Sequence, residues 1–188
     1  MEKHRRVITV NSSFLRADWA DAIYACDRAW WEAHFETVQQ RCEGEFWTVN
    51  RDISRVFGLN FIESEKGGGL SKRSNTIRLG GSTSGGGGNS GYQAVSLALH
   101  FGAARVILLG YDMQFSGKRK HWHPDHGGKM HNPDQRLMDG WVRRFAELAS
   151  EATATIINCT RETALTCFPR QALEKVLGSE GAGVSRAT

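Results

Sequence analysis

One stretch, residues 79–112, constrains the fold more than any other part of the chain. It joins a glycine-dense loop to an apolar segment from Tyr92 to Phe101, and a short Gly-Ala-Ala-Arg break then leads into the apolar run from Val106 to Leu109. A helix followed by a strand, both apolar on most sides, is typical of a sheet with covered faces. The stretch therefore predicts an α/β protein, with the polar residue Asp112 just beyond the carboxyl end of a buried strand.

The start of the predicted helix is a candidate anion site. A side chain at positions 84, 89 or 90 could cap the helix, and the free N–H groups of its first turn would then face a phosphate. The loop has neither the P-loop spacing nor the dinucleotide-binding glycine spacing, so a mobile surface loop stays open as the alternative. Asp112 is placed to bind a sugar hydroxyl or a metal ion. The predicted ligand-binding residues of this stretch are Ser84, Gly88, Asn89, Ser90, Gly91 and Asp112.

Length and composition fit one globular domain. The chain has 188 residues, of which 40% are hydrophobic, and this is enough to bury a core. We expect a single Rossmann-like domain over residues 1–177 and a flexible tail over 178–188. The net charge of +4 is too small to indicate nucleic acid by itself, and it leaves nucleic acid open as a partner.

Cysteine spacing and hydropathy bear on the compartment. The four cysteines form no C-x-x-C pair, which argues against a structural zinc site and a disulfide framework. No apolar run approaches the roughly 20 residues that a membrane span needs. The first ten residues contain no signal-peptide segment. These features predict a cytoplasmic protein with reduced thiols and no membrane partner; the oligomeric state stays open.

Five segments have the composition of buried strands, and we expect all of them in one mostly parallel sheet. They are residues 7–11, 22–26, 46–49, 105–110 and 154–158. Asn11 ends the first of these segments, Ser12 follows it directly, and Asp27 directly follows the second. Because ligands of open α/β folds bind at the carboxyl ends of strands, these three residues are further candidates for a ligand site, together with Asp112.

Two long helices are expected over residues 28–41 and 133–151, where helix formers dominate. In the first helix, the adjacent Trp30 and Trp31 suggest core packing, with one of the two rings at the rim of the core.

A polar segment after Asp112 concentrates four of the seven histidines. Histidine titrates near neutral pH and is the commonest general base and metal ligand. The cluster matches no established zinc spacing. Substrate binding or acid–base catalysis, metal binding and a solvent-facing loop all stay open as hypotheses. We predict that the loop folds over the site and that the catalytic residues are His121, His123 and His126.

Three motifs together resemble a known group of proteins. They are Ser90-Gly91 at the start of an apolar helix, the segment from Gly102 to Asp112 (GAARVILLGYD), and the closing INCTRET…CFPR. This combination resembles the Rossmann-like group of 6-hydroxymethylpterin diphosphokinase-like proteins and bacterial sialyltransferases that use CMP-sialic acid. The opening VNSSF…WADAIYACDRAWWEAH is similar to small members encoded by phages and prophages.

The resemblance implies a Rossmann-like three-layer fold and a nucleotide or nucleotide-sugar donor, such as a CMP-sugar. By motif position Asn11, Ser90, Gly91 and Asp112 carry over best. The hypothesis of an enzyme leaves open a divalent metal ion with Asp27 or Asp112 as its ligand. The expected activity is transfer of a glycosyl or phosphoryl group from the donor to an acceptor that the sequence leaves open.

The alternative is a non-catalytic nucleotide-binding or interaction protein of phage origin that acts in the host cytoplasm. Since one fold hosts many functions, the resemblance does not decide between the two.

Overall fold

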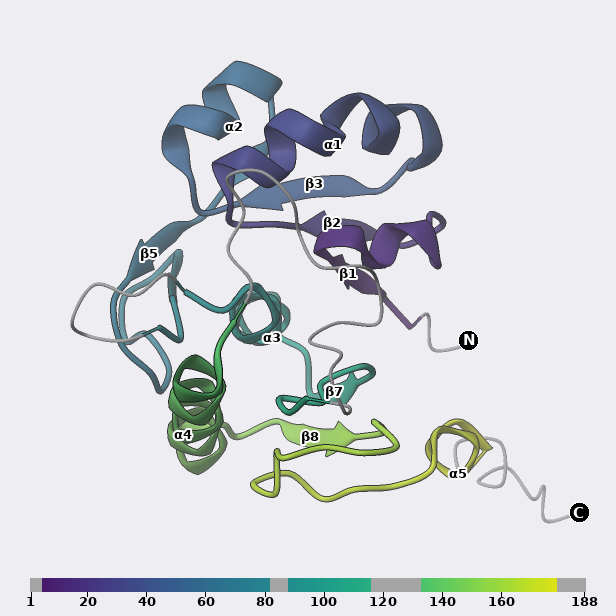
Figure 1. The fold of residues 1–188 in the computed structure, drawn as a ribbon, viewed down its shortest axis with the longest axis vertical. Coiled ribbons are helices and arrows are strands. Elements are labelled where there is room, and N and C mark those ends of the chain that lie inside the picture. Colours follow the sequence, from purple (N-terminus) through teal and green to yellow (C-terminus); the bar gives the residue numbers. More distant parts are fainter. Residues whose placement is uncertain (1–4, 82–87, 116–132, 179–188) are drawn as a thin grey trace, which may run out of the picture.

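The computed structural model describes residues 5–81, 88–115 and 133–178 (Figure 1). Four strands form a parallel sheet in the order β1-β2-β3-β4. Their bounds are Ile8–Val10 for β1, Ala22–Tyr24 for β2, Glu45–Thr48 for β3 and Asn60–Phe61 for β4.

Four more strands form two separate parallel pairs. Strand β5 (Glu63–Glu65) pairs with β6 (Thr76–Arg78), and β7 (Arg105–Leu108) pairs with β8 (Thr155–Asn158). The α/β class and the parallel pairing are thus confirmed. The expectation of one sheet holding all five predicted strands is wrong, because the described strands divide among three sheets. Apolar patterns indicate which segments extend, but tertiary contacts decide which strands become neighbours.

Helices connect the strands. They are the 3₁₀ helix η1 (Asn11–Leu15), α1 (Arg28–Arg41), α2 (Arg51–Phe57), α3 (Ser90–His100), α4 (Gln135–Glu151) and α5 (Leu173–Gly178). Local chemistry sets several of their ends. The Asn50 side chain accepts a hydrogen bond from the Ile53 N–H, and Gly58 ends α2 in the left-handed conformation with φ +66°. Asp134 caps α4 in the same way, since it accepts from the Leu137 N–H at 2.8 Å.

One face of the four-stranded sheet packs on α1 and α2. Ile23 and Ala25 point to this face and meet a cluster that includes Trp30, Trp31 and Ile53. The expectation of one tryptophan at the rim is wrong, because Trp30 and Trp31 are 1% and 0% exposed. The Trp31 indole N–H donates to the Ala25 carbonyl at 3.0 Å, so the second ring is accommodated in the core with its polar atom satisfied.

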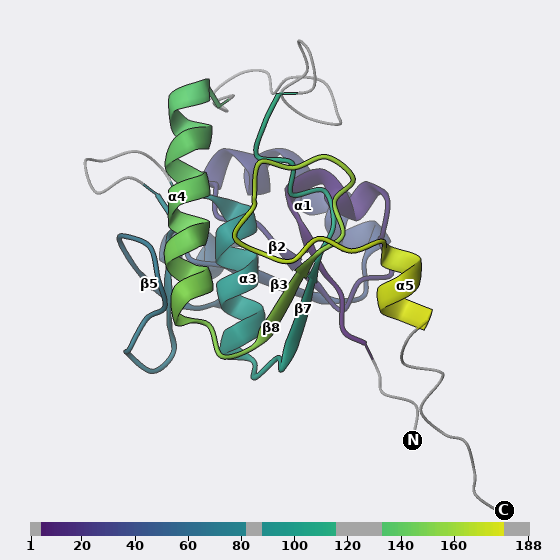
Figure 2. The same cartoon turned by 90° about the horizontal axis from the view of Figure 1, so that it is seen from below.

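The opposite face of the same sheet packs on α3. Tyr24, which alternates with Ile23 along β2, lies in a cluster with Ala94 and Leu97 of α3. The β7–β8 pair is also covered on both sides: Leu108 packs with Phe145 of α4, and Ile157 packs with Val176 of α5. Figure 2 shows α3 and α4 on one side of β7 and β8 and α5 on the other. Helix α3 therefore contacts both the larger sheet and the β7 pair. In the part of the chain that the structure describes, no helix has the length and apolarity needed to cross a membrane.

Candidate functional site

The candidate site is organised by the first turn of α3. Asn89 caps this helix, and its Oδ1 accepts a hydrogen bond from the Tyr92 N–H at 2.8 Å. Gly88 precedes the cap at a position where a Cβ would overlap the Gln93 side-chain amide and lie 2.7 Å from the Leu79 carbonyl oxygen. Glycine is thus required for this entry into the helix by close packing.

Two N–H groups of the turn, those of Ser90 and Gly91, have no acceptor among the residues that the structure describes. They are the free donors expected at a helix start. The next N–H groups along the helix are occupied, because Asn89 accepts from both Tyr92 and Gln93. Two adjacent donors without an acceptor in the described part of the chain, at the positive end of a helix dipole, suit a phosphate or another anion.

The residues just beyond the carboxyl end of β2, called here the exit from β2, contact this turn. Cys26 Sγ lies 3.0 Å from Ser90 Oγ, across 64 residues of sequence. Burial, together with the nearby Asp27 carboxylate, raises the pKa of the Cys26 thiol to about 12. At neutral pH the thiol is therefore protonated and can donate its hydrogen to Ser90.

The exit from β7 reaches the same turn from another sheet. The Tyr111 hydroxyl donates to the Gly91 carbonyl at 3.0 Å, and burial raises the pKa of this phenol well above its usual range. Asn89 Nδ2 lies 4.0 Å from Met113 Sδ. Met113 has φ +48°, a left-handed conformation that is uncommon for this residue type and that turns the chain immediately after Asp112.

The exit from β1 supplies Asn11, which starts η1 with φ +48°. Parallel pairing in register through Val10 and Tyr24 sets it beside the exit from β2. Its Oδ1 atom is buried and has no hydrogen-bond partner among the described residues. An unpaired buried carbonyl oxygen costs about 1–3 kcal/mol, and a hydroxyl or amino group of a ligand could remove that cost.

The segment after β8 contributes residues that lie in the INCTRET motif but were not among the predicted site residues. Thr160 and Thr163 bind the main chain of Tyr111, and the buried Asn158 binds both threonines. Hydroxyl residues after a predicted strand are a weak indication of such a network, because the sequence does not show which neighbouring strand they meet.

The two predicted acidic residues are both exposed. Asp27 precedes α1 and makes no capping hydrogen bond with its side chain. Desolvation by neighbouring atoms, together with the charge of Glu162, raises the pKa of the Asp112 carboxyl. Over residues 5–81, 88–115 and 133–178, no group of three or more histidine, cysteine, aspartate or glutamate residues is arranged to hold a metal ion.

Of the predicted site residues, Asn89, Ser90 and Gly91 form the turn itself, and Gly88 leads into it. Asp27 follows Cys26, and Asp112 lies between two residues that contact the turn. Ser12 differs from the expectation: its hydroxyl accepts from the Trp30 indole N–H at 3.4 Å and thus faces the core beside α1. Ser84, His121, His123 and His126 lie outside the described residues.

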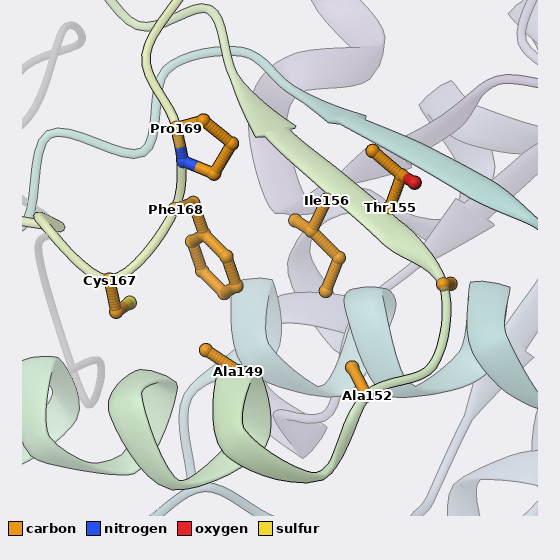
Figure 3. Close-up of a pocket in the computed structure, with 8 residues that line it drawn as sticks. Ala149, Ala152, Thr155, Ile156, Cys167, Phe168 and Pro169 are labelled. Carbon is orange, nitrogen blue, oxygen red and sulfur yellow. The ribbon is translucent and has the colours of Figure 1, made fainter.

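A pocket of about 210 Å³ lies elsewhere, between the end of α4, the start of β8 and residues 167–169 (Figure 3). Phe168 and Ile156 point into the space above Ala149 and Ala152 in this view, and Thr155 is the one lining residue with a polar side-chain oxygen. Because it lies at the amino end of β8, it is separate from the predicted site at the carboxyl ends of the strands.

Comparison with protein-family models, with curated proteins and with solved structures finds no match to this chain.

Proposed function

We propose that this protein binds a nucleotide or nucleotide-sugar donor at the first turn of α3 and transfers a glycosyl or phosphoryl group from it. The observation that supports the proposal is the meeting of two sheets at this turn. Ser90 is contacted from the exit of β2 and Gly91 from the exit of β7, each at 3.0 Å. Ligands of α/β proteins bind where strand ends and a helix start converge.

Each part of such a donor has a chemical counterpart near the turn. The N–H groups of Ser90 and Gly91, which have no acceptor among the described residues, would donate to phosphate oxygens. The unpaired Asn11 Oδ1 would accept from a hydroxyl or amino group of the nucleoside. The Asp112 carboxylate would accept from a sugar hydroxyl.

The transfer step needs a base for the acceptor. In the proposed reaction an acceptor hydroxyl attacks the transferred group, the bond from that group to the nucleotide phosphate breaks, and the base takes the hydroxyl proton. His121, His123 and His126 remain the predicted bases. Asp27 or Asp112 is the proposed ligand of a divalent cation. The positive charge of such a cation would stabilise the leaving phosphate.

Calorimetric titration with CMP, UMP, ADP and a CMP-sugar, with and without magnesium, tests donor binding. We expect specific binding of at least one of them. Ser90→Ala keeps the N–H group but removes the contact between the Ser90 hydroxyl and Cys26 Sγ, which holds the first turn of α3 against the end of β2, so it should weaken binding about fivefold to tenfold. Ser96→Ala is the matched control, because Ser96 is a buried serine of the same helix whose hydroxyl has no partner among the described residues.

Turnover of the bound donor then separates a transferase from a binding protein. Replacing His121, His123 and His126 together by alanine should abolish turnover and leave nucleotide binding largely intact. A chain that binds none of these ligands contradicts the proposal. Specific binding without turnover of any offered donor would replace the transferase with a nucleotide-binding protein.

A further inference from the structure

Side-chain hydroxyls from the β8 exit hold the main chain just before Asp112. Regular pairing of β7 with β8 ends at Leu108, and beyond it the partners change from main chain to side chain. The Tyr111 N–H donates to Thr160 Oγ1 at 2.9 Å, and the Tyr111 carbonyl accepts from Thr163 Oγ1 at 2.7 Å. One residue further, the Asp112 carbonyl accepts from the Ala164 N–H at 2.8 Å.

A buried asparagine fixes the two threonines in turn. Asn158 is 0% exposed; its Oδ1 accepts from the Thr160 N–H at 3.0 Å and its Nδ2 donates to Thr163 Oγ1 at 3.2 Å. The Leu165 N–H also donates to Thr163 Oγ1. Each of these polar atoms has a partner. Asn158 and Thr160 are buried and Thr163 is half-buried, and satisfied networks of this kind are rigid.

The network is also connected to α3 through Tyr111. The phenol oxygen of this residue bonds to Gly91, and its ring packs edge-on against Phe145 at 5.9 Å between centroids. The position of Asp112 relative to the first turn of α3 is therefore set by Tyr111, whose main chain the threonines hold.

We infer that Thr160 and Thr163 are positioning residues, which hold Asp112 at a fixed distance from the first turn of α3 so that both bind one nucleotide. The inference rests on the proposed function and extends it to residues that touch no ligand. The physical reason is that two binding groups on separate elements act together only if their spacing is fixed before the ligand arrives.

The test uses the full chain, with CMP as the probe, and combines calorimetric titration with amide hydrogen exchange. Thr163→Val and Thr160→Val remove one hydroxyl each at nearly constant volume, and Thr163→Ser and Thr160→Ser restore it. Thr166→Val is the matched control, since Thr166 is exposed and its hydroxyl makes no hydrogen bond with the described residues. We expect each valine variant to bind CMP about tenfold more weakly and to exchange the Ala164 amide about tenfold faster. The serine variants and Thr166→Val should behave as wild type.

Several results would overturn the inference. Valine variants that bind CMP as wild type does, or that keep wild-type exchange at Ala164, show that the hydroxyls do not position Asp112. Failure of both valine variants to fold shows that the network serves the whole fold and not the site. If the serine variants bind CMP as weakly as the valine variants do, the loss of affinity comes from lost packing and not from the lost hydroxyl. A wild-type chain that binds neither CMP nor another nucleotide contradicts the proposed function, whereas a wild type that binds CMP with unaffected variants contradicts this inference alone.

Discussion

The buried hydrogen bond between Tyr24 and Gln93 provides a quantitative test of how α3 is fixed to the four-stranded sheet. Both side chains are 0% exposed, and the Tyr24 hydroxyl donates to Gln93 Oε1 at 2.6 Å. The other end of the same amide donates to the Leu79 carbonyl at 2.9 Å. Gln93 thus ties the last residue of β2 to the segment that follows β6.

Tyr24→Phe removes one oxygen atom and leaves Gln93 Oε1 buried without its donor. An unpaired buried acceptor costs about 1–3 kcal/mol, so we expect the free energy of unfolding to fall by that amount. For a domain of this size, each kcal/mol corresponds to a decrease of about 2–4 °C in the melting temperature.

Gln93→Met keeps nearly the same volume but removes both polar atoms. It should cost about as much as Tyr24→Phe or somewhat more, because the Tyr24 hydroxyl then has no acceptor. The Leu79 carbonyl keeps a partner, since the Asn89 N–H also donates to it at 3.0 Å. The double variant should cost less than the sum by about 1–2 kcal/mol, because neither partner remains to be left unpaired.

Urea denaturation of the wild type, the two single variants and the double variant measures this coupling. Tyr92→Phe is a useful comparison, since its hydroxyl donates to the Gly69 carbonyl and has no contact with Gln93. Its effect should therefore be additive with that of Gln93→Met. Additive energies for the Tyr24 and Gln93 pair, within about 0.3 kcal/mol, would refute the reasoning.

Four further outcomes are expected. Gly88→Ala should lower the free energy of unfolding, measured by urea denaturation, by about 1–3 kcal/mol, because the added Cβ would overlap Gln93. Gly140→Ala in α4 should raise it by about 0.5–1 kcal/mol, since only the Arg143 side chain comes within 4 Å of the added Cβ. Equal effects of the two substitutions would contradict the packing argument. Iodoacetamide at about pH 8.5 should alkylate Cys26 at least about a hundredfold more slowly in the native protein than in the urea-unfolded chain, because the pKa of the Cys26 thiol is about 12 in the folded protein. Comparable alkylation rates, measured by mass spectrometry, would show that Cys26 is an ordinary thiol. The raised pKa of Asp112 means that its ionisation opposes folding. The stability of Asp112→Asn relative to wild type should therefore be constant at low pH and should increase as the pH rises above the ordinary carboxyl pKa of about 4; a decrease over that range would reverse the sign of the shift. Glu32→Gln should change stability by less than about 0.5 kcal/mol, because its i,i+4 pair with Arg28 is half exposed; a loss of more than about 1 kcal/mol would contradict this.

The candidate site was only partly predictable from sequence. The cap at Asn89 and the turn at Ser90 and Gly91 follow from local chemistry, since a glycine loop before an apolar run indicates a helix start. The contact between Cys26 and Ser90 does not, because it joins residues 64 positions apart. The hydroxyl network of Thr160 and Thr163 was missed for the same reason.

The sequence by itself determined the α/β class and most of the elements. Alternating or continuous apolar runs predicted the strands at β1, β2, β3, β7 and β8, and helix formers without breakers predicted α1 and α4 near their observed bounds. These are local properties, because periodicity and capping act within a few residues.

Only the tertiary structure decided how the elements were assembled. It divided the parallel strands among three sheets, buried both Trp30 and Trp31, and directed the Ser12 hydroxyl to the core instead of the site. It also set α3 against two of the sheets, so that exits from both contact its first turn. Pairing and packing join residues far apart in the chain, and their energies depend on which surfaces meet, which no local pattern specifies.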